Sequence, residues 1–172
     1  MGVLSNVDIM NAVSSGRLVI DPYEDSNVQA ATIDLRVGNR FLFPEYYLAG
    51  GRGFLDSRED FPYIEKEMDE LMILPHHFVL GTTVERLSLP DDLAGRVDGK
   101  SRIGRRGLIV QTAGHITPGF SGEITLELFN ANQMPIRVKY MQPICQVEFH
   151  ELKTPSTRPY SGSYSGQRGP KV

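Results

Sequence analysis

Short runs of alternating apolar and polar residues dominate this chain between residues 33 and 150. Successive side chains of such a run point to opposite faces, which is the pattern of a half-buried strand. Gly, Pro, Asn and Asp residues separate the runs at short intervals. We therefore expect strands at Arg40–Phe43, His77–Glu85, Leu93–Asp98, Leu108–Gln111, Glu123–Asn130, Ile136–Tyr140 and Ile144–His150.

Closely spaced strands without helices between them are typical of an antiparallel sandwich or barrel. A further alternating run is expected to place Ile33, Leu35 and Val37 on one face and Thr32, Asp34 and Arg36 on the other. One short helix is expected near the N-terminus, where Ser5–Asp8 has the pattern of a capping box and Gly16 offers a stop. The predicted fold is mainly β.

Two stretches do not fit the strand pattern. Residues 50–70 carry many charges and glycines and are expected to form a surface excursion. Residues 154–172 are rich in Ser, Gly, Pro and Tyr and cannot pack a core of their own. Because no repeat or linker divides the chain, we expect one domain over residues 1–172, with residues 154–172 as a flexible tail.

Composition narrows the classes of protein that the chain can belong to. Its single cysteine, Cys145, is expected in the core and can form neither an internal disulfide nor a zinc cage. A net charge of −3 and a pI near 5.8 argue against a nucleic acid polymer as partner. No signal sequence or long apolar stretch is present, so we expect a soluble cytoplasmic protein without membrane contact.

The densest group of polar side chains lies between Asp98 and Gly107. This stretch contains four cations, a hydroxyl and three glycines. Glycines let backbone N–H groups approach an anion, and Arg and Lys donate charge-assisted hydrogen bonds to it. In one helical turn, Ser101 and Arg105 would share a face. The stretch is therefore either a polyphosphate site or a solvated basic loop.

A second group combines a turn-rich stretch, Gln111–Gly122, with the strand that follows it. On that strand Ile124, Leu126 and Leu128 form the apolar face, and Glu127 lies on the opposite face with Glu123 and Thr125. Periodicity alone leaves Glu127 either a functional carboxylate or an ordinary solvent-facing strand residue. The four histidines show no metal-ligand spacing, so each is expected to be a surface or core histidine.

Taken together, these stretches resemble the dCTP deaminase family of the dUTPase-like superfamily. The resemblance rests on Gly99–Arg105, Thr112–Phe120 and Ile124–Asn130, and it extends to Gln29–Gly38, Pro143–Phe149 and Tyr164–Pro170. It implies a distorted antiparallel β-barrel, jelly-roll-like in form, that assembles as a homotrimer with active sites at subunit interfaces. Deaminases of this superfamily carry a glutamate at the position of Glu127, where dUTPases carry an apolar residue.

The resemblance also implies a site and a reaction. Glu127 would be the catalytic acid and base, with Ser101 and Arg105 around the reacting base and its water. The substrate contacts implied are Lys100, Ser101, Arg102, Gly104 and Arg105 for the triphosphate, Ala113, Thr125 and Leu126 for the base, and Thr117, Gln146, Tyr160 and Gln167 elsewhere on the nucleotide. The tail would close as a lid, and Mg²⁺ would accompany the phosphates.

The chemistry explains the need for a carboxylate. Deamination of cytosine needs a base that takes a proton from the water attacking C4 and an acid that protonates the ring and the departing amine. Zinc-dependent deaminases activate that water with a metal held by His-x-Glu and Pro-Cys-x-x-Cys motifs, which this chain lacks. The expected reaction is therefore zinc-independent hydrolysis of dCTP to dUTP and ammonia, on the route to dUMP and thymidylate.

Three positions depart from the usual pattern of the family. Arg102 stands where serine is usual, Ser163 where lysine is often found, and Thr117 where aspartate is common. A threonine hydroxyl is a poor base for a second water attacking the α-phosphorus. We therefore expect the reaction to stop at dUTP. The alternatives are a bifunctional enzyme that forms dUMP and pyrophosphate, and a non-catalytic nucleotide-binding protein of the same fold.

Overall fold

The structure is a computed structural model that describes residues 2–45, 61–110 and 113–172. Two α-helices, α1 (Asn6–Ser14) and α2 (Ser101–Gly104), and a 3-10 turn, Asp25–Asn27, accompany the strands of this described part. The strands are β1 (Val19–Asp21), β2 (Ile33–Arg36), β3 (Arg40–Pro44), β4 (Tyr63–Glu67), β5 (Glu70–Ile73), β6 (Phe78–Ser88), β7 (Leu93–Gly99), β8 (Leu108–Val110), β9 (His115–Ile116), β10 (Ser121–Asn130), β11 (Ile136–Lys139) and β12 (Pro143–Glu151).

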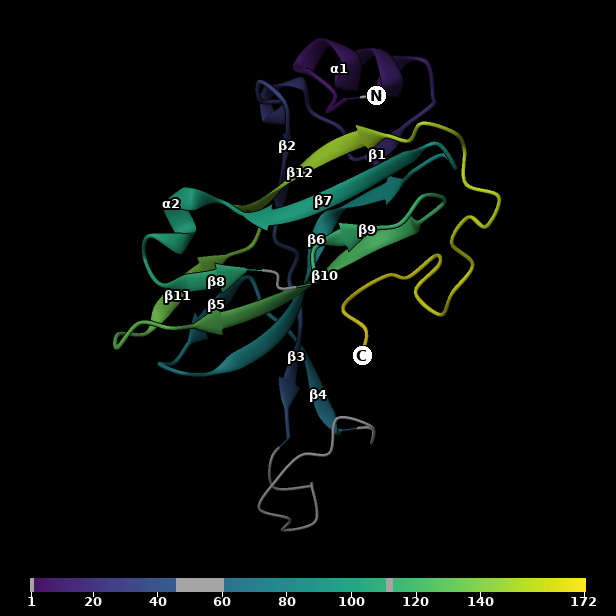
Figure 1. Ribbon diagram of the computed structural model, residues 1–172. Coiled ribbons are helices and arrows are strands. Elements are labelled where there is room, and N and C mark those ends of the chain that lie inside the picture. The colour runs from purple at the N-terminus through teal and green to yellow at the C-terminus, as the bar shows by residue number, and fades with distance from the viewer. Residues whose placement is uncertain (1, 46–60, 111–112) are drawn as a thin grey trace.

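The strands form three antiparallel sheets (Figure 1). The largest has the order β4-β3-β6-β10-β8, with β1 also paired to β6; the second has the order β2-β12-β7-β9, and β11 pairs with β5. Strands β3 and β4 extend as an arm away from the rest of the chain, and α1 lies at the opposite end. The expected mainly β fold is confirmed, although the sheets form a distorted sandwich rather than a closed barrel.

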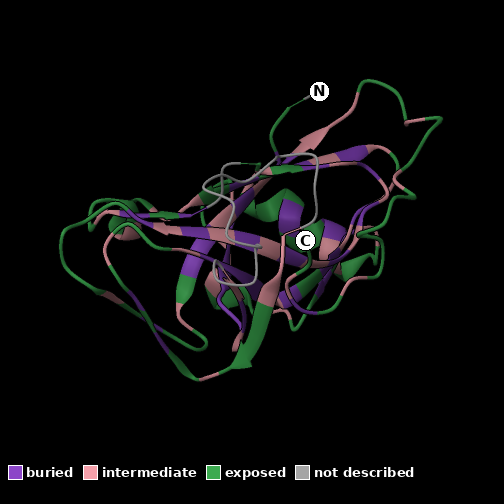
Figure 2. Cartoon of the chain, turned by 90° about the horizontal axis from the view of Figure 1, so that it is seen from below, coloured by how far each residue is buried: buried purple, intermediate pink, exposed green. Residues whose placement is uncertain are grey.

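One continuous hydrophobic core joins the two larger sheets. It contains side chains from β6, β10, β12 and α1, among them Leu87, Leu126, Phe149 and Ile9. Figure 2 shows these buried stretches inside the molecule, while exposed residues gather in loops and strand ends. Cys145 is fully buried and free, as expected, and burial raises the pKa of its thiol. No helix of the described residues is long and apolar enough to cross a membrane.

The N-terminal helix follows its sequence signals closely. The Ser5 side chain accepts a hydrogen bond from the Asp8 backbone, and the Asp8 carboxylate accepts one from the Ser5 backbone at 3.0 Å. These reciprocal bonds satisfy two N–H groups that lack partners within the helix. Helix α1 ends before Gly16, which has a φ of 73°. The predicted capping box is therefore confirmed.

Two expectations about the strands need correction. Residues 63–67 of the expected surface excursion form β4, and Glu70 at its end begins β5, because the backbone pairs with β3 and β11 even where the side chains are charged and exposed. Residues 50–60 of that stretch, together with Gln111 and Thr112, lie outside the described residues.

The second correction concerns β2, all four residues of which are buried. Asp34 and Arg36 are inside because each has a charged partner, Lys100 for Asp34 and Glu85 for Arg36. A pattern of apolar and polar residues cannot reveal such pairs, since a buried charge is tolerated only when a partner from elsewhere in the chain satisfies it.

Candidate active site

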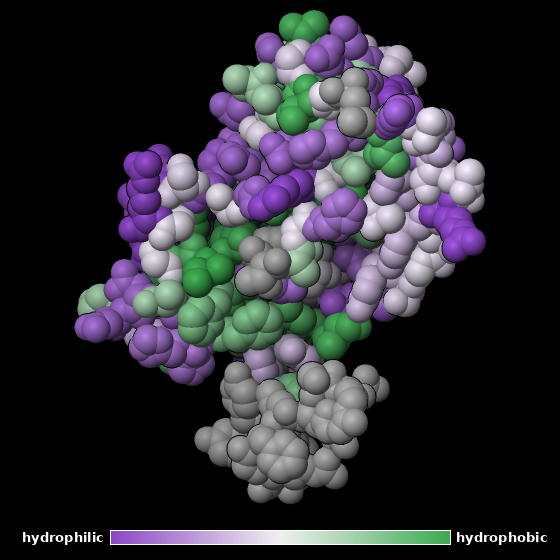
Figure 3. Space-filling view, viewed as in Figure 1, coloured by the Kyte–Doolittle hydropathy of each residue, from purple (hydrophilic) through white to green (hydrophobic). Residues whose placement is uncertain are grey.

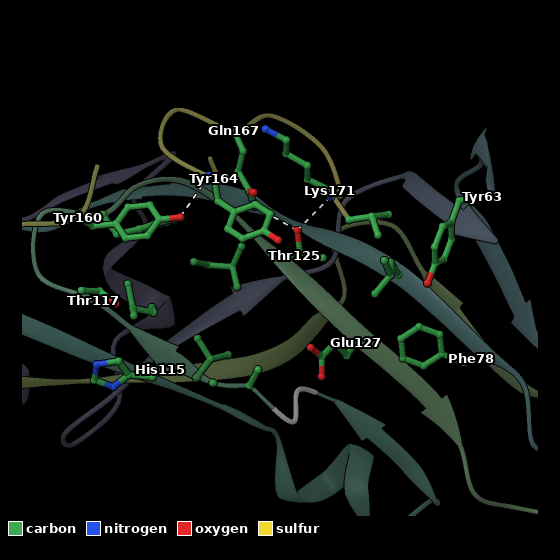
Figure 4. Close-up of a pocket in the computed structure, with 18 residues that line it drawn as sticks. Tyr63, Phe78, His115, Thr117, Thr125, Glu127, Tyr160, Tyr164, Gln167 and Lys171 are labelled. Atoms are coloured by element: carbon green, nitrogen blue, oxygen red, sulfur yellow. Dashed lines mark hydrogen bonds between the residues drawn. The ribbon is translucent and has the colours of Figure 1, made fainter. Parts of the chain in front are cut away.

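A pocket of about 490 Å³ lies between the middle of β10, the segment before it and the C-terminal segment (Figure 4). It is lined by Tyr63, Phe78, Leu80, Val97, Ala113, Gly114, His115, Ile116, Thr117, Phe120, Ile124, Thr125, Glu127, Tyr160, Tyr164, Gln167, Lys171 and Val172. Of the residues expected at a nucleotide site, this pocket therefore brings together Ala113, Thr117, Thr125, Glu127, Tyr160 and Gln167.

Strand β10 supplies the carboxylate of the pocket. Its residues alternate between partly exposed and buried, so Thr125 and Glu127 face the pocket while Leu126 is fully buried in the core. The Leu126 side chain is therefore not accessible to a ligand. Glu127 pairs in register with Leu80 of β6, in the middle of the largest sheet. A central strand fixes the direction of the side chain, and Figure 4 shows its carboxylate oriented into the pocket.

The loop before β10 forms a second wall through a close backbone approach. The Val97 N–H donates to the Gly114 carbonyl at 2.7 Å, and a Cβ on Gly114 would lie 2.2 Å from the Val97 carbonyl oxygen. No other residue fits this position without moving β7. The approach holds Ala113 and His115, the neighbours of Gly114, at the pocket.

The C-terminal segment forms the third wall. The Tyr160 backbone N–H donates to the Pro118 carbonyl at 2.8 Å, and its ring packs against Phe120 with centroids 5.8 Å apart. Further along, the Gln167 side chain donates to the Thr125 hydroxyl at 3.1 Å. The tail thus contacts one of the residues expected to bind the base.

The expected phosphate-binding residues of α2 do not line this pocket. Ser101, Arg102, Gly104 and Arg105 are exposed, and Arg102 and Arg105 form no ion pair with any residue that the structure describes. The helical turn itself is as expected, since the Arg105 N–H donates to the Ser101 carbonyl at 3.0 Å. Within one chain, Arg102 and Arg105 therefore lie on a different surface from Glu127.

Lys100 and Gln146 also lie away from the pocket. The Lys100 ammonium pairs with the Asp34 carboxylate, whose Oδ2 accepts a hydrogen bond from Gln29 at 3.3 Å. Gln146 is partly buried on β12, in register with Asp34 on one side and Asp98 on the other. Lys100 and Asp34 thus link the start of α2 to β2.

Several pocket residues were not found by reasoning from the sequence. Tyr63 and Phe78 contribute aromatic side chains from β4 and β6, and Lys171 and Tyr164 come from the tail. His115, which was expected to be a surface or core histidine, also lines the pocket. Nothing in the local pattern marks these residues, since β4 was missed and the tail has no periodicity. Among the described residues, no three His, Cys, Asp or Glu side chains gather as a metal-ligand set.

A solved structure with a similar fold is the 2'-deoxycytidine 5'-triphosphate deaminase from Agrobacterium tumefaciens. The TM-score is 0.68 at 22% sequence identity, over 86% of this chain and 47% of that one. This chain therefore spans about half the length of that protein. At this level of identity the likeness concerns the fold alone, and it agrees with the mainly β architecture.

Curated relatives are similar over nearly their whole length. A dCTP deaminase, dUMP-forming, from Dictyoglomus thermophilum is 42% identical over 98% of this chain and 92% of the relative. One of the same name from Aquifex aeolicus is 41% identical over 97% and 91%. These names contradict the expectation that the reaction stops at dUTP. That expectation assumed that the residue at position 117 must take a proton from the second water. A hydroxyl can also orient a water by hydrogen bonding without taking its proton.

A family model described as dCTP deaminase-like matches residues 3–152, which include the pocket residues of β6, β7 and β10. The match covers most of the chain and agrees with the identities of about 40% to the relatives above. The chain therefore belongs to the dCTP deaminase family.

Proposed function

We propose that this protein deaminates dCTP without zinc and converts the product to dUMP and pyrophosphate. The observation that carries the proposal is the Glu127 carboxylate, which lies in a pocket with the Thr125 hydroxyl and the backbone of Ala113. The names of the relatives from Dictyoglomus thermophilum and Aquifex aeolicus support dUMP as the end product. The enzyme would be a hydrolase in both steps, acting first on a carbon–nitrogen bond.

In the first step, Glu127 would take a proton from water as the oxygen attacks C4 of cytosine. The same carboxyl group would then return protons to the ring nitrogen and to the departing amine, so that dCTP and water give dUTP and ammonia. The backbone at Ala113 and Leu126 and the Thr125 hydroxyl would hold the base against Glu127. In the second step, Thr117 would orient the water that attacks the α-phosphorus.

The triphosphate needs more cations than the pocket of one chain supplies, since Lys171 is the one Lys or Arg side chain among its described lining residues. Arg102 and Arg105 are exposed without ion pairs in the described chain, and Ser101 lies one helical turn before Arg105. We propose that in a homotrimer the α2 loop of one subunit, Lys100–Arg105, completes the pocket of the next, where Gln146 would also approach the nucleotide. In that arrangement Ser101 and Arg105 would meet the reacting base and its water.

An exposed apolar surface supports subunit contact. Met72, Leu74, Ile109 and Met134 are between 44% and 69% exposed. Figure 3 shows apolar side chains gathered on one face of the molecule, beside the arm. Exposed apolar side chains that gather on one face are typical of a protein interface.

A mixing experiment tests whether the site is shared. Glu127→Gln and Arg105→Ala chains, each with a different tag, are coexpressed and the mixed oligomers are purified. If one subunit supplies Glu127 and the next supplies Arg105, each mixed trimer contains one complete site, so about a third of its sites are complete and activity returns. Each variant alone should be inactive. Mixed oligomers as inactive as the single variants would show that both residues act within one chain.

Magnesium would enter with the substrate. The polar side chains of the pocket include the hydroxyls of Thr117 and Thr125 and the carboxylate of Glu127, and such oxygen donors suit Mg²⁺. We propose that the ion is held mainly by triphosphate oxygens and neutralises their charge. Residues 154–172 would act as a lid on the single catalytic domain, since Tyr160 and Gln167 already line the pocket.

The product assay decides between the possible reactions. Purified protein is incubated with dCTP and Mg²⁺, and dCTP, dUTP, dUMP and pyrophosphate are separated over time. We expect ammonia, dUMP and pyrophosphate in equal amounts, with little free dUTP. Accumulation of dUTP without pyrophosphate would exclude the second step. Binding of dCTP without release of ammonia would point instead to a non-catalytic nucleotide-binding protein.

A further inference from the structure

The C-terminal segment joins the largest sheet at Glu123, near the start of β10. The Glu123 N–H donates to the Gln167 carbonyl at 3.1 Å, and the Gln167 side chain donates to the Glu123 carbonyl at 2.6 Å. Gly122 and Gln167 also form a parallel bridge. These bonds fix the point at which the tail crosses β10, two residues before the pocket residue Thr125.

The Glu123 carboxylate accepts hydrogen bonds from three segments of the chain. Its Oε2 accepts hydrogen bonds from the Gly169 N–H at 2.5 Å, from Arg40 at 3.2 Å and from the Thr82 hydroxyl at 3.3 Å. The donors come from the tail, β3 and β6. The Glu123 side chain is only 15% exposed, so water competes little for these bonds, and charge-assisted bonds of this kind are stronger than neutral ones.

Gly169 is suited to this contact in two ways. Its φ is 79°, a conformation that other residues rarely adopt. A Cβ at this position would also lie 2.8 Å from Cζ of Arg40. A larger residue would therefore strain the backbone and push the Arg40 guanidinium away from Glu123. The contact between the tail and Glu123 therefore depends on a glycine at position 169 and on the place of the Arg40 guanidinium.

We propose that Glu123 is a positioning residue that latches the tail over the pocket, with Arg40 and Thr82 holding its carboxylate in place. The inference deepens the proposed function and rests on it. Neither Glu123 nor Arg40 lines the pocket, whereas Gln167, Tyr164 and Lys171 of the tail do. Glu123 therefore acts on the nucleotide through the tail, by keeping these side chains above Glu127.

Trypsin tests the latch without any need for activity. The Arg168–Gly169 bond is a tryptic site, and its Gly169 N–H is bonded to Glu123 when the tail is closed. In Glu123→Ala we expect release of the peptide that begins at Gly169, measured by mass spectrometry, to be several-fold faster than in the unmodified protein. Glu123→Gln, which keeps an oxygen that can accept the Gly169 N–H, should lie between them. Equal cleavage rates would overturn the latch.

The matched control is Glu67→Ala. Glu67 lies on β4, in register with Arg40 of β3. Its carboxylate accepts a hydrogen bond from the Asn39 side chain at 3.0 Å. Among the described residues, it forms no hydrogen bond or ion pair with the tail. This variant should be cleaved at the same rate as the unmodified protein, and faster cleavage would assign the effect to general loosening of the sheet.

Kinetics then test whether Glu123 acts only through the tail. In the full chain, Glu123→Ala should raise KM for dCTP about tenfold, the effect of one charge-assisted hydrogen bond, with a smaller change in kcat. In a chain that ends at Gly166, the same substitution should change neither parameter further. A further loss in the shortened chain would contradict the latch. If the unmodified protein does not turn over dCTP, the proposed function fails, and the cleavage rates alone decide on the latch.

Discussion

Glu127→Gln should lower the rate of dCTP deamination by at least about 100-fold, the lower end of what a positioned acid and base contributes. The amide has nearly the shape of the carboxylate but cannot take a proton from water and return it. Nucleotide binding should change little, because the remaining walls of the pocket are untouched. Ammonia release in single-turnover reactions and the Kd for dCTP measure the two effects separately.

The control is Glu65→Gln, which makes the same chemical change in the same sheet. Glu65 pairs in register with Leu42, Leu42 with Leu80, and Leu80 with Glu127, so the two carboxylates lie in one row across four strands. Glu65 is exposed and does not line the pocket. Its variant should keep full activity. Substantial turnover by Glu127→Gln would remove Glu127 from the mechanism.

The sequence was most informative where local rules determine structure. The capping box at Ser5 located α1, and the alternation from Ile124 to Leu128 assigned Glu127 to the face opposite the core. Strand β4 was missed because three of its five residues are charged and it joins the sheet at the edge, through backbone pairing with β3. Edge strands often carry such charges, which protect them from pairing with other chains.

The site was harder to derive than the fold, because it depends on contacts between distant segments. Resemblance to a family grouped Glu127 with Ser101 and Arg105, but within one chain Ser101 and Arg105 lie outside the pocket that contains Glu127. No local sequence pattern encodes how subunits meet. The bond from Gly169 to Glu123 joins residues 46 positions apart. Periodicity only placed Glu123 on the same face of the strand as Glu127, since its partners in β3, β6 and the tail come together only on folding.

Loss of the buried ion pair between Arg36 of β2 and Glu85 should have the largest effect on the free energy of unfolding. Arg36 donates from its Nε to Glu85 at 2.6 Å and from its backbone N–H at 2.8 Å, and it also pairs with Glu24. Desolvation alone would lower the pKa of Arg36, but its hydrogen bonds to Glu85 and Glu24 raise it. The guanidinium is therefore charged in the folded protein and depends on these carboxylates.

Glu85→Ala should lower the free energy of unfolding by about 3–5 kcal/mol, because it leaves Arg36 charged, buried and short of a partner. Urea unfolding at a fixed protein concentration measures the change. Glu70→Ala is the control, since Glu70 pairs with Arg137 and Lys139 at 3.8 and 3.7 Å on the surface, and such pairs contribute about 1 kcal/mol or less. A loss in Glu85→Ala no larger than that in Glu70→Ala would contradict the prediction.

Replacing both partners separates the cost of an unpaired charge from the value of the pair. In the double variant Arg36→Met with Glu85→Leu no buried charge is left without its partner, because Glu24, which also loses Arg36, is 49% exposed. Much of the stability lost in Glu85→Ala should therefore return. Recovery should be incomplete, because the Arg36 backbone N–H also donates to the Glu85 carboxylate and would lose its acceptor. A double variant less stable than Glu85→Ala would show that the ion pair itself, rather than relief of a buried charge, stabilises this part of the fold.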